Sequence, residues 1–291
     1  MDSSLKKLIN EQGVSLININ LLSEIDCKKI KNHYNYIYHL AAVIGVKHVL
    51  ASPQIVLSNN FLLLNNAIAI AKRQKNLDRF VFASTSEVYA GTLAHFGLEF
   101  PTLESTVLTV NDLSDARSSY MLSKIYGEAL CFQSGLPITI IRPHNFYGPR
   151  MGLSHVIPEL MKKVIKAENK SIEVFSIGHK RTFCFIDDAT EMITLLAESK
   201  KSKTEVYNIG NEIGEIKMGD LAKMIINLIS KEIKIESKVS NNGSPERRCP
   251  DISKLQRVIS YHQKYSLEEG LKETFSWYKK NVFSGNEASA I

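Results

Sequence analysis

The sequence has 291 residues, of which 44% are hydrophobic and 23% charged, and its formal net charge is +6. The apolar fraction excludes disorder as the main state, and the length predicts one large domain or two modest ones. The basic residues are spread along the chain without interleaved aromatic residues, which favours a small anionic ligand over nucleic acid.

A membrane or secreted location is not expected. The most apolar stretch, residues 61–70, is interrupted by Asn65 and Asn66, whereas about 18 uninterrupted apolar residues are needed to span a bilayer. The first residues do not resemble a secretory signal. The four cysteines contain no C-x-x-C pair and the histidines show no metal-ligand spacing, so we expect a reduced, cytoplasmic protein without a metal site.

Short β-branched runs alternate with helical patterns over the first two thirds of the chain. In chain order they predict a strand at 14–20, a helix at 23–32, a strand at 36–40, a helix at 53–75, a strand at 79–84, a helix at 114–133, a strand at 137–142, a helix at 187–200 and a strand at 205–209. Strands separated by helices form a parallel, two-sided α/β sheet.

The later elements predict a second, smaller lobe. They are a helix at 155–168 capped by Ser154, short segments at 172–175 and 181–186, a helix at 217–230, a strand at 233–239 and a helix at 267–278. We therefore predict a doubly wound cofactor domain over residues 1–150, to which 181–211 return, and a substrate-binding lobe over 151–180 and 212–291.

Three distinctive segments follow predicted strands, namely 39–42, 84–89 and 142–149. Ligands of open parallel sheets bind at the carboxyl ends of the strands. Tyr120 and Lys124 are four residues apart on a predicted helix and therefore share one face. A neighbouring ammonium favours ionisation of a phenol, so this pair is suited to act as a general base, and Thr85 could hold a substrate alcohol beside it.

Together these segments resemble an extended short-chain dehydrogenase/reductase of the NAD-dependent epimerase/dehydratase family, which modifies nucleotide sugars. The matching segments cover nearly the whole chain and are 39–42 (HLAA), Asn60, 84–89 (STSEVY), 120–124 (YMLSK), 142–149 (RPHNFYGP), 181–188 (RTFCFIDD), 208–211 (NIGN) and 248–252 (RCPDI). The resemblance implies a Rossmann-like fold, NAD as cofactor, a nucleotide-sugar substrate and a homodimer formed through the helix of Tyr120 and the helix at 53–75.

The resemblance also implies roles for individual residues. Tyr120 would take the proton of a sugar hydroxyl, usually at C4, while Lys124 would hold the nicotinamide ribose and lower the pKa of the tyrosine. Thr85 would bond to the same hydroxyl. The implied catalytic set is Thr85, Glu87, Tyr120 and Lys124, the cofactor set is Asn20, Ala41, Ala42, Asn60, Tyr120 and Lys124, and the substrate set is Ser86, Asn145, Arg181 and Arg248.

Other residues of these motifs favour structural roles. The segment 147–149 contains Gly-Pro, which is turn chemistry as much as a ligand contact. Asp187 and Asp188 are typical of the N-terminal cap of the following helix. A buried or surface histidine is the default interpretation for His144, although its loop faces the expected ligand.

One departure from the family pattern concerns the start of the chain. No two of the 15 glycines are spaced as G-x-G or G-x-x-G, so the turn that receives the dinucleotide pyrophosphate is lacking. The strand at 14–20 resembles the family's third strand, so a β-α-β-α segment of roughly 50 to 60 residues is expected to be missing. The strand at 36–40 would then expose an edge, and NAD would bind weakly.

Three functions follow from this interpretation. The first is an epimerase-type enzyme that transiently oxidises the sugar at C4, and the second is a nucleotide-sugar decarboxylase acting on a glucuronate. A 4,6-dehydratase is less favoured, because that branch has an aspartate where Ser86 stands. The third is a truncated, non-catalytic relative that acts as a binding or regulatory protein.

Overall fold

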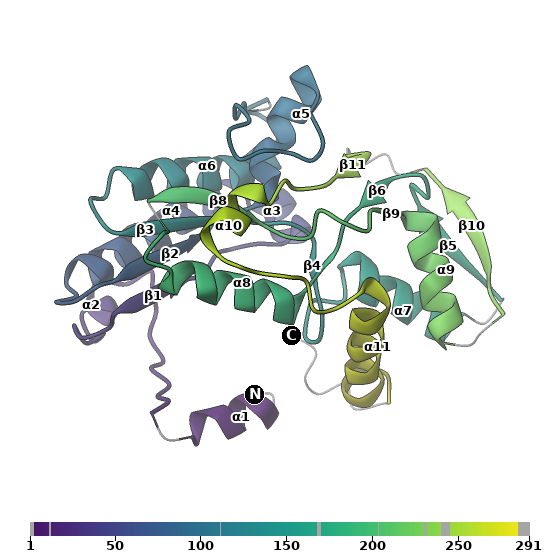
Figure 1. Ribbon diagram of the computed structural model, residues 1–291, viewed down its shortest axis with the longest axis horizontal. Helices are drawn as coiled ribbons and strands as arrows, with labels where there is room; N and C mark the ends of the chain where they lie inside the picture. The colour runs from purple at the N-terminus through teal and green to yellow at the C-terminus, as the bar shows by residue number, and fades with distance from the viewer. Residues whose placement is uncertain are drawn as a thin grey trace.

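A parallel sheet of four strands forms the centre of the molecule (Figure 1). This computed structural model describes residues 3–11, 13–110, 112–167, 170–202, 204–229, 232–239 and 245–284. In spatial order the strands are β1 (Tyr36–His39), β2 (Arg79–Ala83), β3 (Ile138–Pro143) and β8 (Glu205–Ile209), and each neighbouring pair is parallel. The predicted α/β fold is therefore confirmed.

Helices pack on both faces of this sheet because its strands are apolar on both sides. Phe80 and Phe82 join a buried cluster on one face, whereas Val81 between them joins a second cluster on the other. The covering helices are α4 (Pro53–Lys72) and α6 (Ser118–Phe132) on the first face, and α8 (Ile186–Glu198) and α10 (Ser253–Val258) on the second. The site described below lies at the carboxyl ends of these strands.

A third buried cluster lies beside the sheet, on the right in Figure 1. Its elements are α7 (Val156–Lys166), β5 (Ser171–Phe175), α9 (Met218–Ile229), β10 (Lys234–Lys238) and α11 (Leu267–Tyr278). Strands β5 and β10 pair in parallel. Helix α11 has its predicted bounds, because Ser266 and Glu269 form a capping box that fixes its first turn.

Short strands lie between the sheet and the third cluster. They are β4 (Phe146–Tyr147) paired with β7 (Cys184–Phe185), and β6 (Lys180–Arg181) flanked by β9 (Ile216–Lys217) and β11 (Arg247–Arg248). The segment at 181–186 therefore contains parts of two short strands, β6 and β7. Between β6 and β7 the chain passes from the small sheet with β9 and β11 to the small sheet with β4. The segment around Arg248 thereby lies next to the strand ends of the main sheet.

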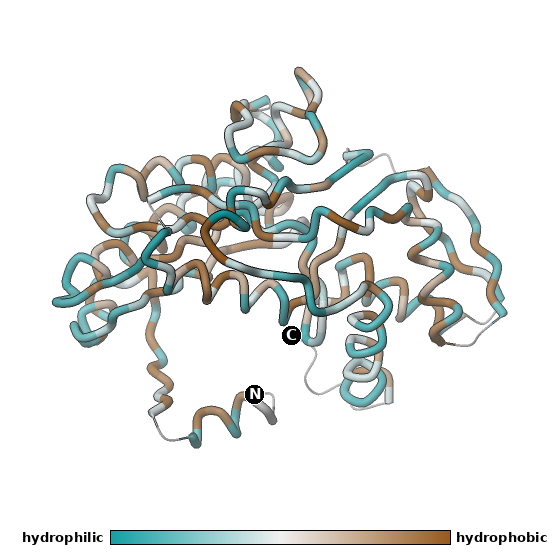
Figure 2. Tube along the Cα trace, viewed as in Figure 1, coloured by the Kyte–Doolittle hydropathy of each residue, from teal (hydrophilic) through white to brown (hydrophobic). Residues whose placement is uncertain are grey.

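The predicted strand at 14–20 is wrong. These residues are extended but pair with no strand among the described residues, since a strand needs a hydrogen-bonding neighbour. Leu16 is 58% exposed, and the segment leads away from the sheet to α1 (Ser3–Ile9) as a partly apolar arm (Figures 1 and 2). The strand β1 lies at the edge of the sheet, as predicted.

Several predicted helix bounds also differ. The helix at 23–32 is only α2 (Glu24–Cys27), and the N-cap of α7 is His155 rather than Ser154. Four short helices were not predicted, because they are too short for a periodic pattern. They are α3 (Val46–Ala51), η1 (Ser86–Tyr89), α5 (Ala90–Phe96) and the π-helical turn η2 (Lys279–Phe283), and the segment of α10 was not predicted either.

Helix α4 is long and apolar enough to cross a membrane by length and composition alone. Its apolar side packs against the sheet and α6, and its two buried asparagines, Asn60 and Asn66, bond within the protein. Asn66 donates to the carbonyl of Leu21 at 2.8 Å. We therefore interpret α4 as a core helix.

Candidate active site

The three residues expected to carry the chemistry lie together at the end of β2. Thr85 lies two residues after β2 and is the N-cap of η1, with its Oγ1 accepting a hydrogen bond from the Glu87 backbone N–H at 3.2 Å. The Thr85 hydroxyl lies beside Tyr120 of α6 and lowers the pKa of its phenol. Lys124, one turn further along α6, donates from Nζ to the Ala83 carbonyl at 2.7 Å.

The pKa of Tyr120 moves opposite to the expected direction. Burial raises it to about 12, and the bond from Thr85 offsets only part of this effect. The Nζ of Lys124 lies 5.8 Å from the Tyr120 ring centroid and is turned to the end of β2. Desolvation dominates the pKa of Tyr120 in this structure, and a lowering of that pKa by Lys124 stays a prediction.

Lys124 itself is an unusual lysine. Its side chain is 5% exposed and its Nζ lies 5.0 Å from the centroid of the Phe82 ring. Burial lowers its pKa to about 8, while the charge of Glu128 acts in the opposite direction. The pKa of Lys124 is thus close to neutral pH, so that a small change of pH changes its protonation.

A buried polar network, which the sequence did not reveal, supports the strand ends. Arg142 of β3 forms a bidentate salt bridge with Glu128 of α6, in which the Nε–Oε1 distance is 2.9 Å and the Nη2–Oε2 distance is 2.6 Å. The same Glu128 accepts from Ser84 at 2.5 Å, directly before Thr85. An arginine inside an otherwise apolar strand was the only sequence signal of this pair. The network fixes the backbone that presents Thr85.

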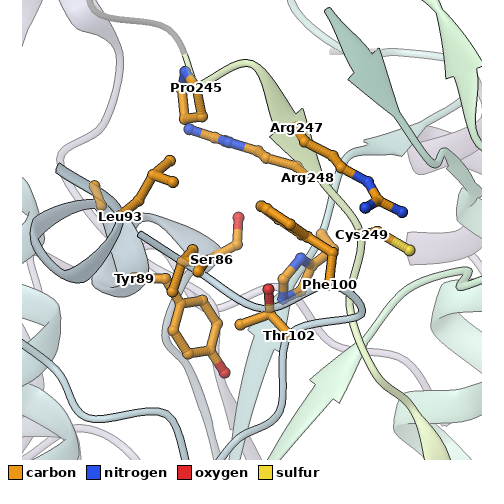
Figure 3. A pocket seen from close by; sticks show the side chains of 12 residues that line it. Ser86, Tyr89, Leu93, Phe100, Thr102, Pro245, Arg247, Arg248 and Cys249 are labelled. Carbon is orange, nitrogen blue, oxygen red and sulfur yellow. The ribbon is translucent and has the colours of Figure 1, made fainter. Parts of the chain in front are cut away.

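A hollow of about 320 Å³, its open mouth included, lies beside η1 (Figure 3). Its walls are Ser86, Tyr89, Ala90, Leu93, Leu98, Phe100, Thr102, His144, Pro245, Arg247, Arg248 and Cys249. Two of the predicted substrate residues, Ser86 and Arg248, are among them. The remaining walls are Tyr89 of η1, His144 after β3, and residues of α5, the loop after it and the segment around β11. The contact of this last segment with α5 was not predicted from the sequence.

Charged side chains at this hollow are paired with each other. Nη2 of Arg248 lies 2.5 Å from Oε1 of Glu87, and Nε of Arg247 lies 2.7 Å from Oε1 of Glu215. The two arginines extend in opposite directions from β11 (Figure 3), as neighbours on a strand do. The predicted catalytic residue Glu87 and the predicted substrate residue Arg248 are thus in direct contact.

Two further predicted substrate residues bond to the backbone around them. The buried guanidinium of Arg181 donates to the carbonyls of Lys180 (2.7 Å) and Pro245, and burial, with the nearby Arg248, lowers its pKa to about 10. Asn145 has a φ of 44° and donates to the Thr182 carbonyl at 2.9 Å. Neither side chain is among the walls of the hollow.

Among the predicted cofactor residues, Asn60 and Asn20 bond to nearby loops. Asn60 is buried and holds the loop after β1, because it accepts from the Val43 N–H at 2.7 Å and donates to the Val43 carbonyl at 3.1 Å. It thereby fixes Ala41 and Ala42, which are half-buried. Asn20 is exposed, and its Oδ1 accepts from the Leu22 N–H at 3.0 Å.

Tyr147 and Asp188, which were expected to have structural roles, both lie in the packed interior, but Asp188 differs from its expected role as a helix cap. Tyr147 is buried in the third cluster. Asp188 is not a helix cap, since Phe185 holds that position in α8. Its carboxylate instead accepts from the Tyr261 hydroxyl and from the backbone N–H of Lys264 at 3.0 Å. Within the described ranges, no group of three or more His, Cys, Asp or Glu side chains could hold a metal ion.

Comparison with known proteins assigns the class to which this fold and site belong. The NAD dependent epimerase/dehydratase family matches residues 2–210. The chain therefore belongs to that family of NAD-dependent enzymes.

Several relatives of the chain are named as decarboxylases or epimerases of nucleotide sugars. UDP-N-acetyl-alpha-D-glucosaminuronate decarboxylase of Bacillus cytotoxicus is 31% identical over 281 residues, covering 92% of this chain and 84% of the relative. UDP-glucuronic acid decarboxylase 6 of Arabidopsis thaliana is 32% identical, covering 81% and 67%. The structure of UDP-glucuronic acid 4-epimerase from Bacillus cereus, in complex with UDP-glucuronic acid and NAD, aligns with a TM-score of 0.78, 26% identity and coverage of 95% and 85%.

Proposed function

We propose that this protein is a nucleotide-sugar enzyme that oxidises its sugar at C4 through Thr85, Tyr120 and Lys124. The observation that carries the proposal is the placement of a phenol, a hydroxyl beside it and a buried lysine at one strand end. When bound, NAD would accept the sugar's hydride and later return it. Tyr120, ionised to its phenolate, would receive the proton of the C4 hydroxyl at Oη, and Thr85 would orient both groups.

The fit of this chain to NAD differs between the two ends of the cofactor. Tyr120 and Lys124 suit the nicotinamide ribose, since a phenol and an ammonium can both donate to ribose oxygens. For the pyrophosphate, the sequence offers no closely spaced glycines that let a backbone approach, and β1 is the edge of the described sheet. No step is therefore assigned to contacts with the pyrophosphate or the adenosine.

We propose a UDP-hexuronate, a nucleotide sugar with a carboxylate on C5, as the substrate. The relatives named above act on such sugars, and the 31% identical one is a decarboxylase. Oxidation at C4 makes a β-keto acid, whose carboxylate leaves as CO₂ while its electron pair passes to the C4 carbonyl. Protonation at C5 and return of the hydride complete a reaction with no net redox change. Decarboxylation, which the sequence suggested as the alternative to epimerisation, is thus the first proposal.

Epimerisation at C4 is the second candidate, because the 26% identical structure is a UDP-glucuronic acid 4-epimerase. It uses the same first step but retains the carboxylate, and the hydride returns to the opposite face of C4. Glu87 is proposed to assist either outcome from the rim of the hollow, where Arg248 holds its carboxylate.

The test uses the whole chain with NAD at millimolar concentration and UDP-glucuronate or UDP-N-acetylglucosaminuronate carrying ¹³C at the carboxylate. Decarboxylation releases labelled CO₂ and gives a UDP-pentose in the NMR spectrum. Epimerisation retains the label and inverts C4. If a folded protein changes neither sugar, the proposal is wrong.

The assembly and location are proposed in the same terms. A homodimer would use the outward sides of α4 and α6, where Phe61 and Tyr126 are 40% and 44% exposed and their ring centroids lie 5.2 Å apart. A nucleotide-sugar enzyme of this kind would act in the cytoplasm. Sedimentation of the wild type and of a Phe61→Glu variant tests the dimer, which the charge should dissociate.

A further inference from the structure

His144 is one of the walls of the hollow beside η1, and one of its ring nitrogens has no hydrogen-bond partner among the described residues. The side chain is 3% exposed, follows β3, and lines the hollow together with Ser86 and Arg248. Its Nε2 lies 3.1 Å from Oδ1 of Asn208. Its Nδ1 is buried and has no hydrogen-bond partner among the described residues. Buried polar atoms are nearly always paired, so an unpaired one next to a hollow points to a ligand.

The surrounding bonds fix which nitrogen of His144 carries the proton. Asn208 donates from Nδ2 to the carbonyls of Thr102 (2.9 Å) and Asp251 (3.1 Å), so its amide cannot be reversed without placing oxygen against oxygen. Its Oδ1 therefore faces His144 and can only accept. Nε2 must then be the donor, and Nδ1 of a neutral ring keeps a free lone pair.

The ring stays neutral because it is buried. Burial lowers the pKa of His144 to about 3, and the charges of Arg248 and Arg142 act in the same direction, while the bond to Asn208 opposes them. The Tyr89 hydroxyl holds Asn208 from the other side. It donates to the same Oδ1 at 2.9 Å and accepts from Arg142 at 2.7 Å. The tautomer is thus part of a fixed network and does not depend on pH near neutrality.

We propose that Nδ1 of His144 is the acceptor for one hydrogen-bond donor on the sugar of the ligand, a hydroxyl or an amide N–H. A lone pair in this position repels a carboxylate or a phosphate, which would meet the arginine side of the hollow instead. The identity of the ligand as a nucleotide sugar rests on the proposed function, whereas the acceptor subsite rests on the geometry of His144 and Asn208.

Equilibrium binding tests the subsite without requiring turnover. The probes are UDP-glucuronate, its 2-deoxy and 3-deoxy analogues, and UDP-N-acetylglucosaminuronate, measured by calorimetry on a Tyr120→Phe background at saturating NAD. His144→Gln keeps a donor toward Asn208 but removes Nδ1, so we expect a roughly fivefold to tenfold loss of affinity, the usual worth of one neutral hydrogen bond. His144→Asn can place an amide oxygen near the position of Nδ1 and should bind more tightly than His144→Gln.

The analogues identify the donor. The deoxy sugar that lacks the contacted hydroxyl should bind equally to the parent and to His144→Gln. If UDP-N-acetylglucosaminuronate alone is sensitive to the substitution, the donor is the amide N–H. An equal loss for every probe would mean a purely structural residue and would overturn the proposal, as would unchanged affinity for all four.

A spectrum of the unsubstituted ring gives an independent check. In ¹⁵N-histidine-labelled protein, the resonances absent from His144→Gln should show the Nε2–H tautomer without titration between pH 5 and 8. An Nδ1–H tautomer, or a titration in this range, would overturn the proposal. Specific coupling in the binding assay with no turnover of either sugar would leave the subsite standing and refute the proposed function alone.

Discussion

The two edges of the central sheet are built very differently. On the β8 edge Tyr207 is 1% exposed, and Asn208 is tied to the loops at Thr102 and Asp251. On the β1 edge Tyr38 is 38% exposed, and no strand among the described residues pairs with it on its outer side. Both tyrosines point to the α8 face, because Tyr38 is in register with Val81 of the cluster that contains Tyr207.

This difference separates the two tasks of a dinucleotide enzyme. The polar network of Arg142, Glu128 and Asn208, the candidate site and the hollow all belong to the covered side of the sheet. The open side lies where the family pattern places the strands that receive the pyrophosphate and adenosine. We therefore expect the described residues to hold a sugar and the nicotinamide end more tightly than the rest of the cofactor.

The largest expected effect is on the covered side. Tyr120→Phe keeps the ring but removes the group that takes the proton, so turnover of UDP-glucuronate at saturating NAD should fall by about 10²–10⁴-fold. The matched control is Tyr126→Phe on the same helix, which packs on Phe61 at the surface and should retain full activity. The measurement is single-turnover release of product, and an unchanged rate for Tyr120→Phe would remove it from the catalytic set.

A pair of alanine substitutions tests the two edges directly. Tyr207→Ala should cost about 3–5 kcal/mol of unfolding free energy, since it leaves a cavity in a packed cluster. Tyr38→Ala, on the same face at the open edge, should cost about 1 kcal/mol or less. Urea unfolding of both variants measures the difference. Equal losses would mean that the β1 edge is covered in solution.

The elements that the sequence predicted well are those with local signals. Helix α11 agrees at both ends because a capping box begins it, and the four sheet strands agree because buried strands are continuously apolar. The segment 14–20 has an equally good β-branched pattern and still forms no strand. Its outcome depends on a neighbouring strand, which no local pattern can supply.

The candidate site shows the same division. The sequence predicted that Tyr120, Lys124 and Thr85 lie together. This prediction needed only the spacing of the first two and the position of Thr85 after a strand. The burial of Tyr120, which raises its pKa, is a property of the packed fold and cannot be predicted from residue spacing. The links from Glu128 to Ser84 and from Asn208 to His144 join residues 44 and 64 positions apart, and no spacing rule predicts such pairs.

The affinity for NAD tests the open side. We expect residues 1–291 to bind NAD at least about a hundredfold more weakly than a family member with a glycine-rich turn, since two lost charge-assisted hydrogen bonds already have this effect. Nicotinamide mononucleotide is the control, because it reaches only the end near Tyr120 and Lys124. Calorimetry should give similar constants for the two ligands. Micromolar NAD binding, one per chain, would show that the chain does hold the pyrophosphate.

The last expected effect concerns Lys124 and the dependence of stability on pH. Its pKa is about 8 in the folded protein against an ordinary value of 10.5, so the lysine stabilises the fold fully above pH 10.5 and loses this contribution as the pH falls through 8.

Between these two values the unfolded chain holds a proton that the folded protein has released. The unfolding free energy should therefore rise by up to about 1.4 kcal/mol per pH unit from this group alone. Lys124→Met removes the titration while keeping an unbranched apolar chain. The difference between wild type and Lys124→Met, measured by urea unfolding from pH 7 to 10, should grow in favour of the wild type as the pH rises. A difference independent of pH would mean that Lys124 is solvated like a surface lysine, and that the covered side of the sheet is open at its site.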